Sequence, residues 1–239
     1  MGASFIFDEM PEYIPEEGHP VAEYRQEIAA AGLIVTDWMR PGTVVTLGAF
    51  EQDGNEGNGP EPREWIVLDS DGEKSLLSTR YAIYDLWGAI RADREDSTYR
   101  GWLKGTFYNS AFSETEKAAI LTTRIDNSRA AGDPGDYGVA GGADTEDPVF
   151  ALSYQEAMRY LPLIRETEPT QHVLNRGNIV RYRDGSIGWW LRSFRSNNGM
   201  PSGSVSMMSM KNEIISYSSY SDPQGVRPCI WVDLSALDS

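Results

Sequence analysis

The segment that decides the fold is WWLRSFRSNNGMPSGSVSMMSMKNEIISYSSYSDPQGVRPCIWVDL, residues 189–234. Its two ends, WWLRS and GVRPCIWVDL, are rich in aromatic and β-branched residues, which favour strands. We therefore expect the two ends to be neighbouring strands of one sheet. Their apolar side chains should contribute to the core: Trp190, Leu191, Val226, Ile230 and Val232.

The stretch between these ends has a different composition. Of the 31 residues from Phe194 to Gln224, nine are Ser, three are Asn and four are Met. It holds two basic and two acidic residues, so it is neutral in a chain whose net charge is −15. Tyrosine offers a large contact area at a small entropic cost, serine offers adaptable hydrogen bonds, and methionine offers a pliable apolar surface. This composition favours a surface that displays side chains to a ligand.

The display segment, defined here as residues 194–224, contains the side chains that we expect to meet the ligand. They are Phe194, Arg195, Asn197, Asn198, Met200, Ser202, Ser204, Ser206, Met208, Asn212, Tyr217, Ser219, Tyr220 and Asp222. The expected hot spots are Tyr217 and Tyr220, because aromatic residues dominate binding energy. A second interpretation stays open, since GSVSMMSM alternates partly and would also fit a strand with Met207 and Met210 in a core. Serine and asparagine are also common in ordinary loops.

Two arginines interrupt the apolar ends of the segment. Arg192 and Arg227 each lie between apolar neighbours, and an unpaired buried charge is costly. We therefore expect both to have carboxylate or carbonyl partners. Together with Trp190 and Trp231, they are interpreted as structural residues that orient the display segment. The alternative is that the two arginines clamp an anionic ligand.

The chain divides into an arm, residues 1–41, and a domain, residues 42–239. The arm begins with an acidic stretch that contains prolines. It continues with a predicted helix over 21–34, which Gly32 can cap. This helix would pack on the domain or on a partner subunit, so we expect any oligomer to form through the arm.

Turn signals outline the strands of the domain. Asp71-Gly72 lies between two apolar runs and is a strong hairpin signal, and Asp184-Gly185 indicates a second hairpin. Strands are expected over 43–50 and 226–234. Residues 125–147 are rich in Gly, Asp and Ala and should form a long loop.

Capping signals outline the helices. A helix should begin after Ser97, with Trp102, Leu103 and Phe107 facing inward. Two capping boxes predict further helix starts, one at Ser113-Glu116 and one at Ser153-Glu156. Short helices mixed with strands, and much irregular chain between them, indicate an α+β fold.

The charge balance limits the classes of partner. With 36 acidic and 21 basic residues, the surface should repel phosphate backbones and anionic membranes, so we expect no nucleic-acid binding and no membrane insertion. No stretch approaches about 18 consecutive apolar residues. The N-terminus lacks a basic segment followed by a long apolar one, so no signal peptide is predicted. The expected location is cytoplasmic or virion-associated.

Signals of catalysis are weak. His19 and His172 lie in different contexts without metal-ligand spacing, and the carboxylates form no recognisable acid–base pair. The single cysteine, Cys229, lies in an apolar run and is expected to be a buried hydrophobe and not a nucleophile. We therefore predict no catalytic residue and no metal ligand.

Calcium is the one cofactor that stays open. EQDGNEGN (51–58) and GDPGDYGVAGGADTED (132–147) each offer several hard oxygen ligands. Neither matches the EF-hand spacing, and Asp, Asn and Gly are also ordinary turn residues. The turn interpretation is favoured, and calcium is kept as the alternative.

Several blocks, taken in order, resemble a widespread bacterial domain family of unknown function. They are VTLGAFEQDGNEGNGPEPREWIVLDSDGEKSLLS (45–78), YRGWLKGTFYNSAFSETE (99–116), DTEDPVFALSYQEA (144–157), WWLRS (189–193) and GVRPCIW (225–231). The resemblance covers roughly residues 43–234 and leaves the first ~40 residues outside it.

The closing GVRP also resembles the ending of C-type-lectin-like folds of the formylglycine-generating-enzyme type. The resemblance implies a compact α+β domain with a ligand surface built on irregular chain. The formylglycine enzymes need active-site cysteines, and this chain has only Cys229, so their activity is not implied. One subset of the fold comprises the variable proteins of diversity-generating retroelements, in which a stretch near the C-terminus is hypermutated at adenines. Residues 194–224 occupy the place of such a variable region.

These observations lead to one expected function and two alternatives. The expected function is a non-enzymatic binding protein, a candidate hypervariable receptor, whose ligand is an unknown protein or cell-surface molecule. The first alternative is an enzyme related to the formylglycine-generating fold, with a divergent site near the 125–147 loop. The second is a structural or virion component with a fixed partner.

Overall fold

The structure is a computed structural model that describes residues 37–86, 97–131, 141–164, 167–179, 181, 185–197, 200–208, 214–218 and 223–237. For 194–197, 200–208 and 214–218 it describes the backbone only. The predicted arm helix over 21–34, and with it the expected route to an oligomer, lies outside the described residues.

The strands pair in four antiparallel groups. Their bounds are β1 Val44–Phe50, β2 Glu61–Ser70, β3 Lys74–Thr79, β4 Tyr84–Leu86, β5 Ile120–Leu121, β6 Thr123–Ile125, β7 Thr145–Asp147, β8 Phe194–Asn197, β9 Met200–Met208, β10 Ile214–Ser218, β11 Gln224–Val226 and β12 Cys229–Asp233. The main sheet has the order β1-β2-β3-β12-β5. Three smaller sheets have the orders β10-β9-β8, β11-β4 and β6-β7.

The helices are short. Their bounds are η2 Asp37–Met39, α2 Thr98–Gly101, η3 Trp102–Phe107, α3 Tyr108–Ala111, α4 Glu114–Ala119, η4 Arg129–Ala131, α5 Tyr154–Arg159, α6 Leu161–Ile164, α7 Gln171–Arg176 and η5 Leu234–Ala236. Together with the antiparallel sheets they confirm the α+β class. Within the described ranges, no helix combines the length and the apolar character needed to cross a membrane.

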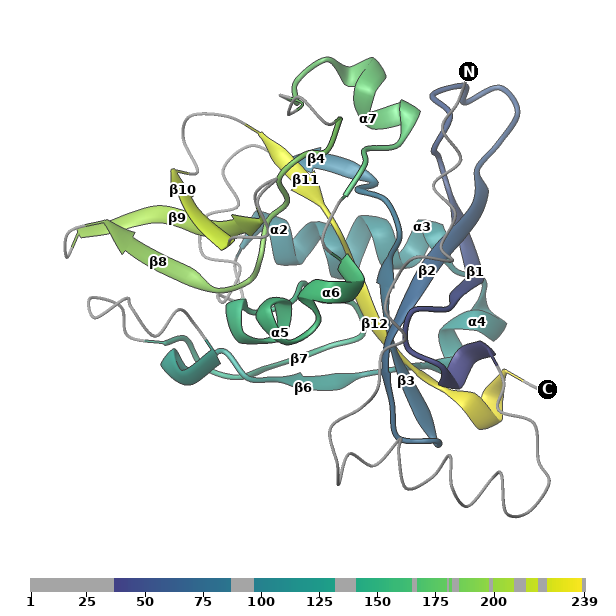
Figure 1. The fold of residues 1–239 in the computed structure, drawn as a ribbon. Coiled ribbons are helices and arrows are strands. Elements are labelled where there is room, and N and C mark those ends of the chain that lie inside the picture. Colours follow the sequence, from purple (N-terminus) through teal and green to yellow (C-terminus); the bar gives the residue numbers. More distant parts are fainter. Residues whose placement is uncertain are drawn as a thin grey trace.

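The main sheet is buried on both faces. Trp65 and Val67 belong to one apolar cluster, whereas Ile66 and Leu68 belong to another, because successive side chains of a strand point to opposite faces. The first cluster includes residues of the continuous run α2–η3–α3, and the second includes residues of α5 and α6. In Figure 1 the run α2–η3–α3 passes behind the yellow C-terminal strands, whereas α5 and α6 lie nearer the viewer. The sheet is therefore the middle layer of the molecule.

The local signals read from the sequence are confirmed. Gly72 turns the β2–β3 hairpin with φ 91°, a conformation that favours glycine. The side chain of Ser97 accepts a hydrogen bond from the backbone N–H of Arg100 at the start of α2. Both capping boxes form, at the starts of α4 and α5. In the run α2–η3–α3, Leu103 and Phe107 are buried and Trp102 packs half-buried against the first cluster.

The single strand predicted over 226–234 is wrong in detail. The chain forms two strands, β11 and β12, with Arg227 and Pro228 between them. Proline has no N–H to give to a ladder, so a strand breaks there. The break lets β11 pair with β4 while β12 pairs with β3 and β5.

The segment WWLRS is also not a full strand of the main sheet. Trp189 makes an isolated parallel bridge to Gly225, and Arg192 N donates to Leu152 O (2.9 Å). The two predicted ends are thus neighbours, although only through this bridge. All five core residues named from the sequence are confirmed as buried.

The second predicted hairpin, with its turn at Asp184-Gly185, lies partly outside the described residues. The described segment after the turn is bonded to another part of the chain, since Ile187 N donates to Thr167 O (2.9 Å). The described parts of the long loop predicted over 125–147 include η4 and β7, and β7 pairs with β6, so the prediction of a continuous loop is wrong there.

Candidate ligand-display site

The two stretches of chain that flank the display segment are hydrogen-bonded to each other. Trp190 N donates to Gly225 O and Gly225 N donates to Gly188 O, each at 2.9 Å. A side chain at Gly225 would not fit, because a Cβ there would lie 2.9 Å from both Ala82 Cβ and Ile187 Cδ1. The stretch that ends at residue 193 and the stretch that begins at residue 224 therefore lie side by side.

Between these ends the backbone forms the small sheet β10-β9-β8. In Figure 1 this sheet projects from the body on the side away from β1. Its register aligns Phe194 with Val205 and Val205 with Tyr217, so these three residues form one row across the sheet. The next row aligns Arg195, Ser204 and Ser218 and belongs to the opposite face.

The predicted display residues fall into two groups. Those within strands of the small sheet are Phe194, Arg195, Asn197, Met200, Ser202, Ser204, Ser206, Met208 and Tyr217. Those outside the described residues are Asn198, Asn212, Ser219, Tyr220 and Asp222. The structure therefore brings nine of the predicted residues onto one small sheet.

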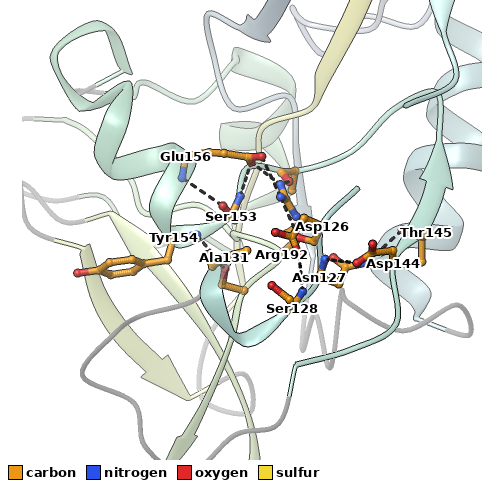
Figure 2. A network of polar contacts seen from close by, with 12 residues as sticks. Asp126, Asn127, Ser128, Ala131, Asp144, Thr145, Ser153, Tyr154, Glu156 and Arg192 are labelled. Carbon is orange, nitrogen blue, oxygen red and sulfur yellow. Dashed lines mark hydrogen bonds and ion pairs between the residues drawn. The ribbon is translucent and has the colours of Figure 1, made fainter. Parts of the chain in front are cut away.

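Arg192 is bonded as expected of a structural anchor (Figure 2). Its side chain, in a residue only 5% exposed, donates Nη1–H to Ala151 O at 2.9 Å and Nη2–H to Asp126 O at 3.2 Å. Both Nη groups also bind Glu156, Nη2 to Oε1 at 2.9 Å and Nη1 to Oε2. Such a two-pronged pair fixes the orientation of the guanidinium as well as its charge.

The same carboxylate ties the anchor to a helix start. Glu156 Oε2 accepts from the backbone N–H of Ser153 at 2.8 Å, which completes the capping box of α5. The neighbouring Ser193 Oγ accepts from Tyr154 N (2.8 Å) and donates to Ala131 O (3.2 Å). The two residues that precede β8 are therefore held by side-chain bonds to the body of the domain.

Arg227 holds the other end in the same manner. Its Nε–H donates to Thr79 O at 2.7 Å, and its Nη1–H donates to Ile164 O at 3.0 Å and to Thr167 Oγ1 at 2.6 Å. The guanidinium also lies 5.2 Å from the centre of the Trp189 ring, a cation–π distance. Burial lowers the pKa of Arg227 to about 10, so it stays charged at neutral pH.

The two structural tryptophans differ in burial. Trp190 is fully buried, and its Nε1–H donates to Leu86 O at 2.9 Å. Its backbone carbonyl accepts from the Tyr99 hydroxyl at 3.1 Å. Trp231 is half-buried and lies under the Lys74 ammonium, 5.2 Å from the ring centre.

The roles of two groups at the site were not predicted from the sequence. Glu156 was predicted as part of a capping box but not as the partner of Arg192. The second group is Asp85 on β4, a buried carboxylate that binds Arg176 Nε and accepts from Asn178 Nδ2 at 2.9 Å. Strand β4 pairs with β11, so this cluster supports the returning end of the display segment. Only contacts distant in sequence create it, and no local motif could have indicated it.

The thiol of Cys229 is buried, as predicted. Burial raises its pKa to about 12. The group is therefore a neutral thiol at neutral pH and is not poised as a nucleophile.

Two carboxylates of the loop 51–58 lie close to a third at the start of β2. One oxygen from each of Glu51, Asp53 and Glu61 lies within 4.8 Å of the others. These groups already accept loop N–H bonds: Glu51 Oε1 from Gly54 (2.6 Å), and Glu61 Oε2 from Gln52 (2.7 Å). The hydrogen bonds account for the turn, and calcium at this loop stays a prediction.

A small cavity lies beside the ordered ends of the 125–147 loop. Among the residues that line it are Arg100 and Asp147, which form a buried ion pair with an Nη2–Oδ1 distance of 2.7 Å. Its volume is about 10 Å³, close to the room that one water molecule needs.

Comparison with known families supplies the remaining finding. Residues 72–234 match the family described as a domain of unknown function (DUF6273). The chain belongs to this family. The DUF6273 match spans both arginine anchors and the whole display segment, whereas β1 and β2 precede it. No curated protein and no solved structure gives a significant match.

Proposed function

We propose that this DUF6273 protein is a non-enzymatic binding protein with a C-type-lectin-like fold, and that residues 194–222 form its ligand surface. The ligand is a protein or a cell-surface molecule. The proposal extends to diversification of this surface by a retroelement.

The observation that carries the proposal is the bonding of the segment's two ends to each other. The hydrogen bonds at Trp190 and Gly225, with Arg192 and Arg227 on the two sides, hold the ends through scaffold residues alone. A segment held in this way can change its inner side chains while the energy of the fold resides elsewhere.

The register of the small sheet supports a binding face. Phe194 and Tyr217 are 23 positions apart in the sequence, yet they share one row with Val205. Clustered aromatic residues are the usual centre of a binding surface. Serine occurs at several positions of the opposite face, including Ser204, Ser206 and Ser218, and would give that face adaptable hydrogen bonds.

The enzyme alternative near the 125–147 loop has less support. The cavity that the described residues form there has a volume of only about 10 Å³, and the two charged groups that line it, Arg100 and Asp147, are already paired with each other. Cys229 is buried with a raised pKa.

The retroelement part is tested in the genome that encodes the chain. We expect a reverse-transcriptase gene nearby, and an imperfect repeat of the codons for 194–224 that differs mainly at adenines. If either the reverse-transcriptase gene or the codon repeat is missing, diversification by a retroelement is rejected. Ligand binding would then be tested on its own.

Ligand binding is tested with a library of chains that carry Tyr or Ser at the nine display positions in the small sheet. The library is displayed on yeast, treated with protease to remove unfolded members, and panned against a purified target such as lysozyme. We expect most members to survive the protease and binders to be enriched. Loss of most members to the protease would contradict the proposal. Survival without enrichment against several unrelated targets would also contradict it.

A further inference from the structure

We infer that the cavity between the β6–β7 hairpin and the segment before β8 binds one internal water molecule, which bridges Arg192 Nε–H and Asn127 Oδ1. The inference does not rest on the proposed function. It follows from two buried, unpartnered polar atoms whose residues line the same small space.

The first atom is the side-chain oxygen of Asn127, a residue 7% exposed. Its amide nitrogen donates to Ala143 O at 3.1 Å and to Thr145 Oγ1 at 3.2 Å. Because a backbone carbonyl can only accept, the bond to Ala143 fixes which amide atom is nitrogen. The other amide atom, Oδ1, is a buried acceptor without a partner in the described part of the chain.

The second atom is Nε of Arg192. Both Nη groups of this side chain are bonded, to Ala151, Asp126 and Glu156, whereas Nε–H has no partner among the described residues. A buried donor left unpaired loses its bond to solvent and gains nothing in return. Donor and acceptor are near each other in the chain fold, since Arg192 Nη2 already binds the carbonyl of Asp126, the residue before Asn127.

The size and charge of the cavity select the ligand. Its volume of about 10 Å³ is close to the roughly 10–15 Å³ that one water molecule requires. A cation there would face Arg192 and Arg100, and an anion would face Asp147 and the oxygen of Asn127, while the charge of Arg100 is already paired with Asp147. Water can accept from Nε–H and donate to Oδ1, so it satisfies both atoms without adding charge.

The water would join the anchor arginine to the β6–β7 hairpin. Arg192 already connects the segment before β8 to α5 through Glu156. The bridge to Asn127 adds a second element to this junction, so the orientation of the guanidinium is fixed from two sides.

The test is a high-resolution crystal structure of the full chain together with two variants. We expect one enclosed water at about 2.7–3.2 Å from both Arg192 Nε and Asn127 Oδ1. Asn127→Leu should lose this water, whereas Thr145→Val, which keeps both partners, should retain it. In solution, the Arg192 Hε proton should show a nuclear Overhauser effect to a long-lived water in the wild type and in Thr145→Val only.

Three outcomes would overturn the inference. They are a wild-type cavity without water density, a direct bond between Asn127 and Arg192 Nε that closes the space, and an ion in place of the water. If Asn127→Leu does not fold, the wild-type density and the solution measurement still decide the question.

Discussion

Strands β12 and β9 are both interior strands but carry different side chains. Each pairs with a strand on both edges, β12 with β3 and β5, and β9 with β8 and β10. In β12, Cys229, Ile230 and Val232 are buried, so both sheet faces depend on its sequence. In β9, serine recurs on one face of the strand. Backbone pairing supports both strands, and under the proposed function only the scaffold strand also needs a particular set of apolar side chains.

The largest expected difference between the two regions concerns their aromatic residues. Trp190→Ala removes a fully buried side chain and its bond to Leu86 O, and should lower the free energy of unfolding by about 3–5 kcal/mol. Phe194→Ala, four positions later in β8, should cost no more than about 0.5 kcal/mol if residue 194 belongs to a display surface. Urea unfolding of both variants measures the difference, and equal losses would remove the distinction between scaffold and display.

The next comparison concerns two arginines three positions apart. Arg192→Ala leaves the Ala151 and Asp126 carbonyls and the Glu156 carboxylate without their partner. Because the Glu156 side chain is 36% exposed and can be rehydrated, the loss should be about 2–3 kcal/mol, below that of a fully buried pair. Arg195→Ala in β8 should change stability by less than about 0.5 kcal/mol. Chemical denaturation separates them, and an Arg192→Ala loss as small as that of Arg195→Ala would mean that Arg192 is no anchor.

A smaller, pH-dependent effect is expected at the α4 cap. Burial acts to raise the pKa of Glu116, but hydrogen bonds from Ser113 and from Gly48 N outweigh it and hold the pKa below its usual value. A carboxyl whose pKa is depressed by folding stabilises the protein above its unfolded pKa, and this stabilisation is lost as pH falls through the folded pKa. Glu116→Gln should therefore cost about 1 kcal/mol at pH 7.

That cost should fade as the pH drops from about 5 to about 3. The control is Glu114→Gln, since the Glu114 side chain is 90% exposed and is paired only with Lys117 three positions away. Melting curves across this pH range are the measurement. A cost of Glu116→Gln that stays constant down to pH 3 would contradict the assignment.

The smallest expected effect is an absence of reaction at the scaffold thiol. With a pKa of about 12 and full burial, Cys229 should not react with Ellman's reagent in the native protein at pH 8, and should react fully in guanidinium chloride. Rapid modification of the folded chain would show that β12 opens and that the scaffold is less closed than its packing indicates.

The features that could be predicted from the sequence are local. The Asp71-Gly72 hairpin and the capping boxes at Ser113 and Ser153 depend on residues a few positions apart, and all three are confirmed. Burial of Trp190 and Ile230 followed from their apolar surroundings.

The features that were missed depend on contacts distant in sequence. The pairing of Arg192 with Glu156 spans 36 positions and that of Arg176 with Asp85 spans 91. The break at Pro228 was visible as a residue, but a continuous strand was predicted because the apolar pattern runs across it. The exposure of the display side chains stays a prediction, since the sequence pattern fits a core strand as well as a binding surface.

The most direct test of the account compares two pairs of tyrosines. The scaffold pair, Tyr99 and Tyr160, is buried and bonded to Trp190 O (3.1 Å) and Asp69 Oδ2 (2.8 Å), while Tyr217 and Tyr220 are the proposed hot spots of the display segment. Thermal melts of Tyr217→Ser/Tyr220→Ser should show a midpoint within about 5 °C of the wild type, and those of Tyr99→Ser/Tyr160→Ser a fall of more than about 10 °C or no folded protein. A fall of more than about 10 °C for the display pair would place its tyrosines in a core and contradict the display of ligand-binding residues on this segment.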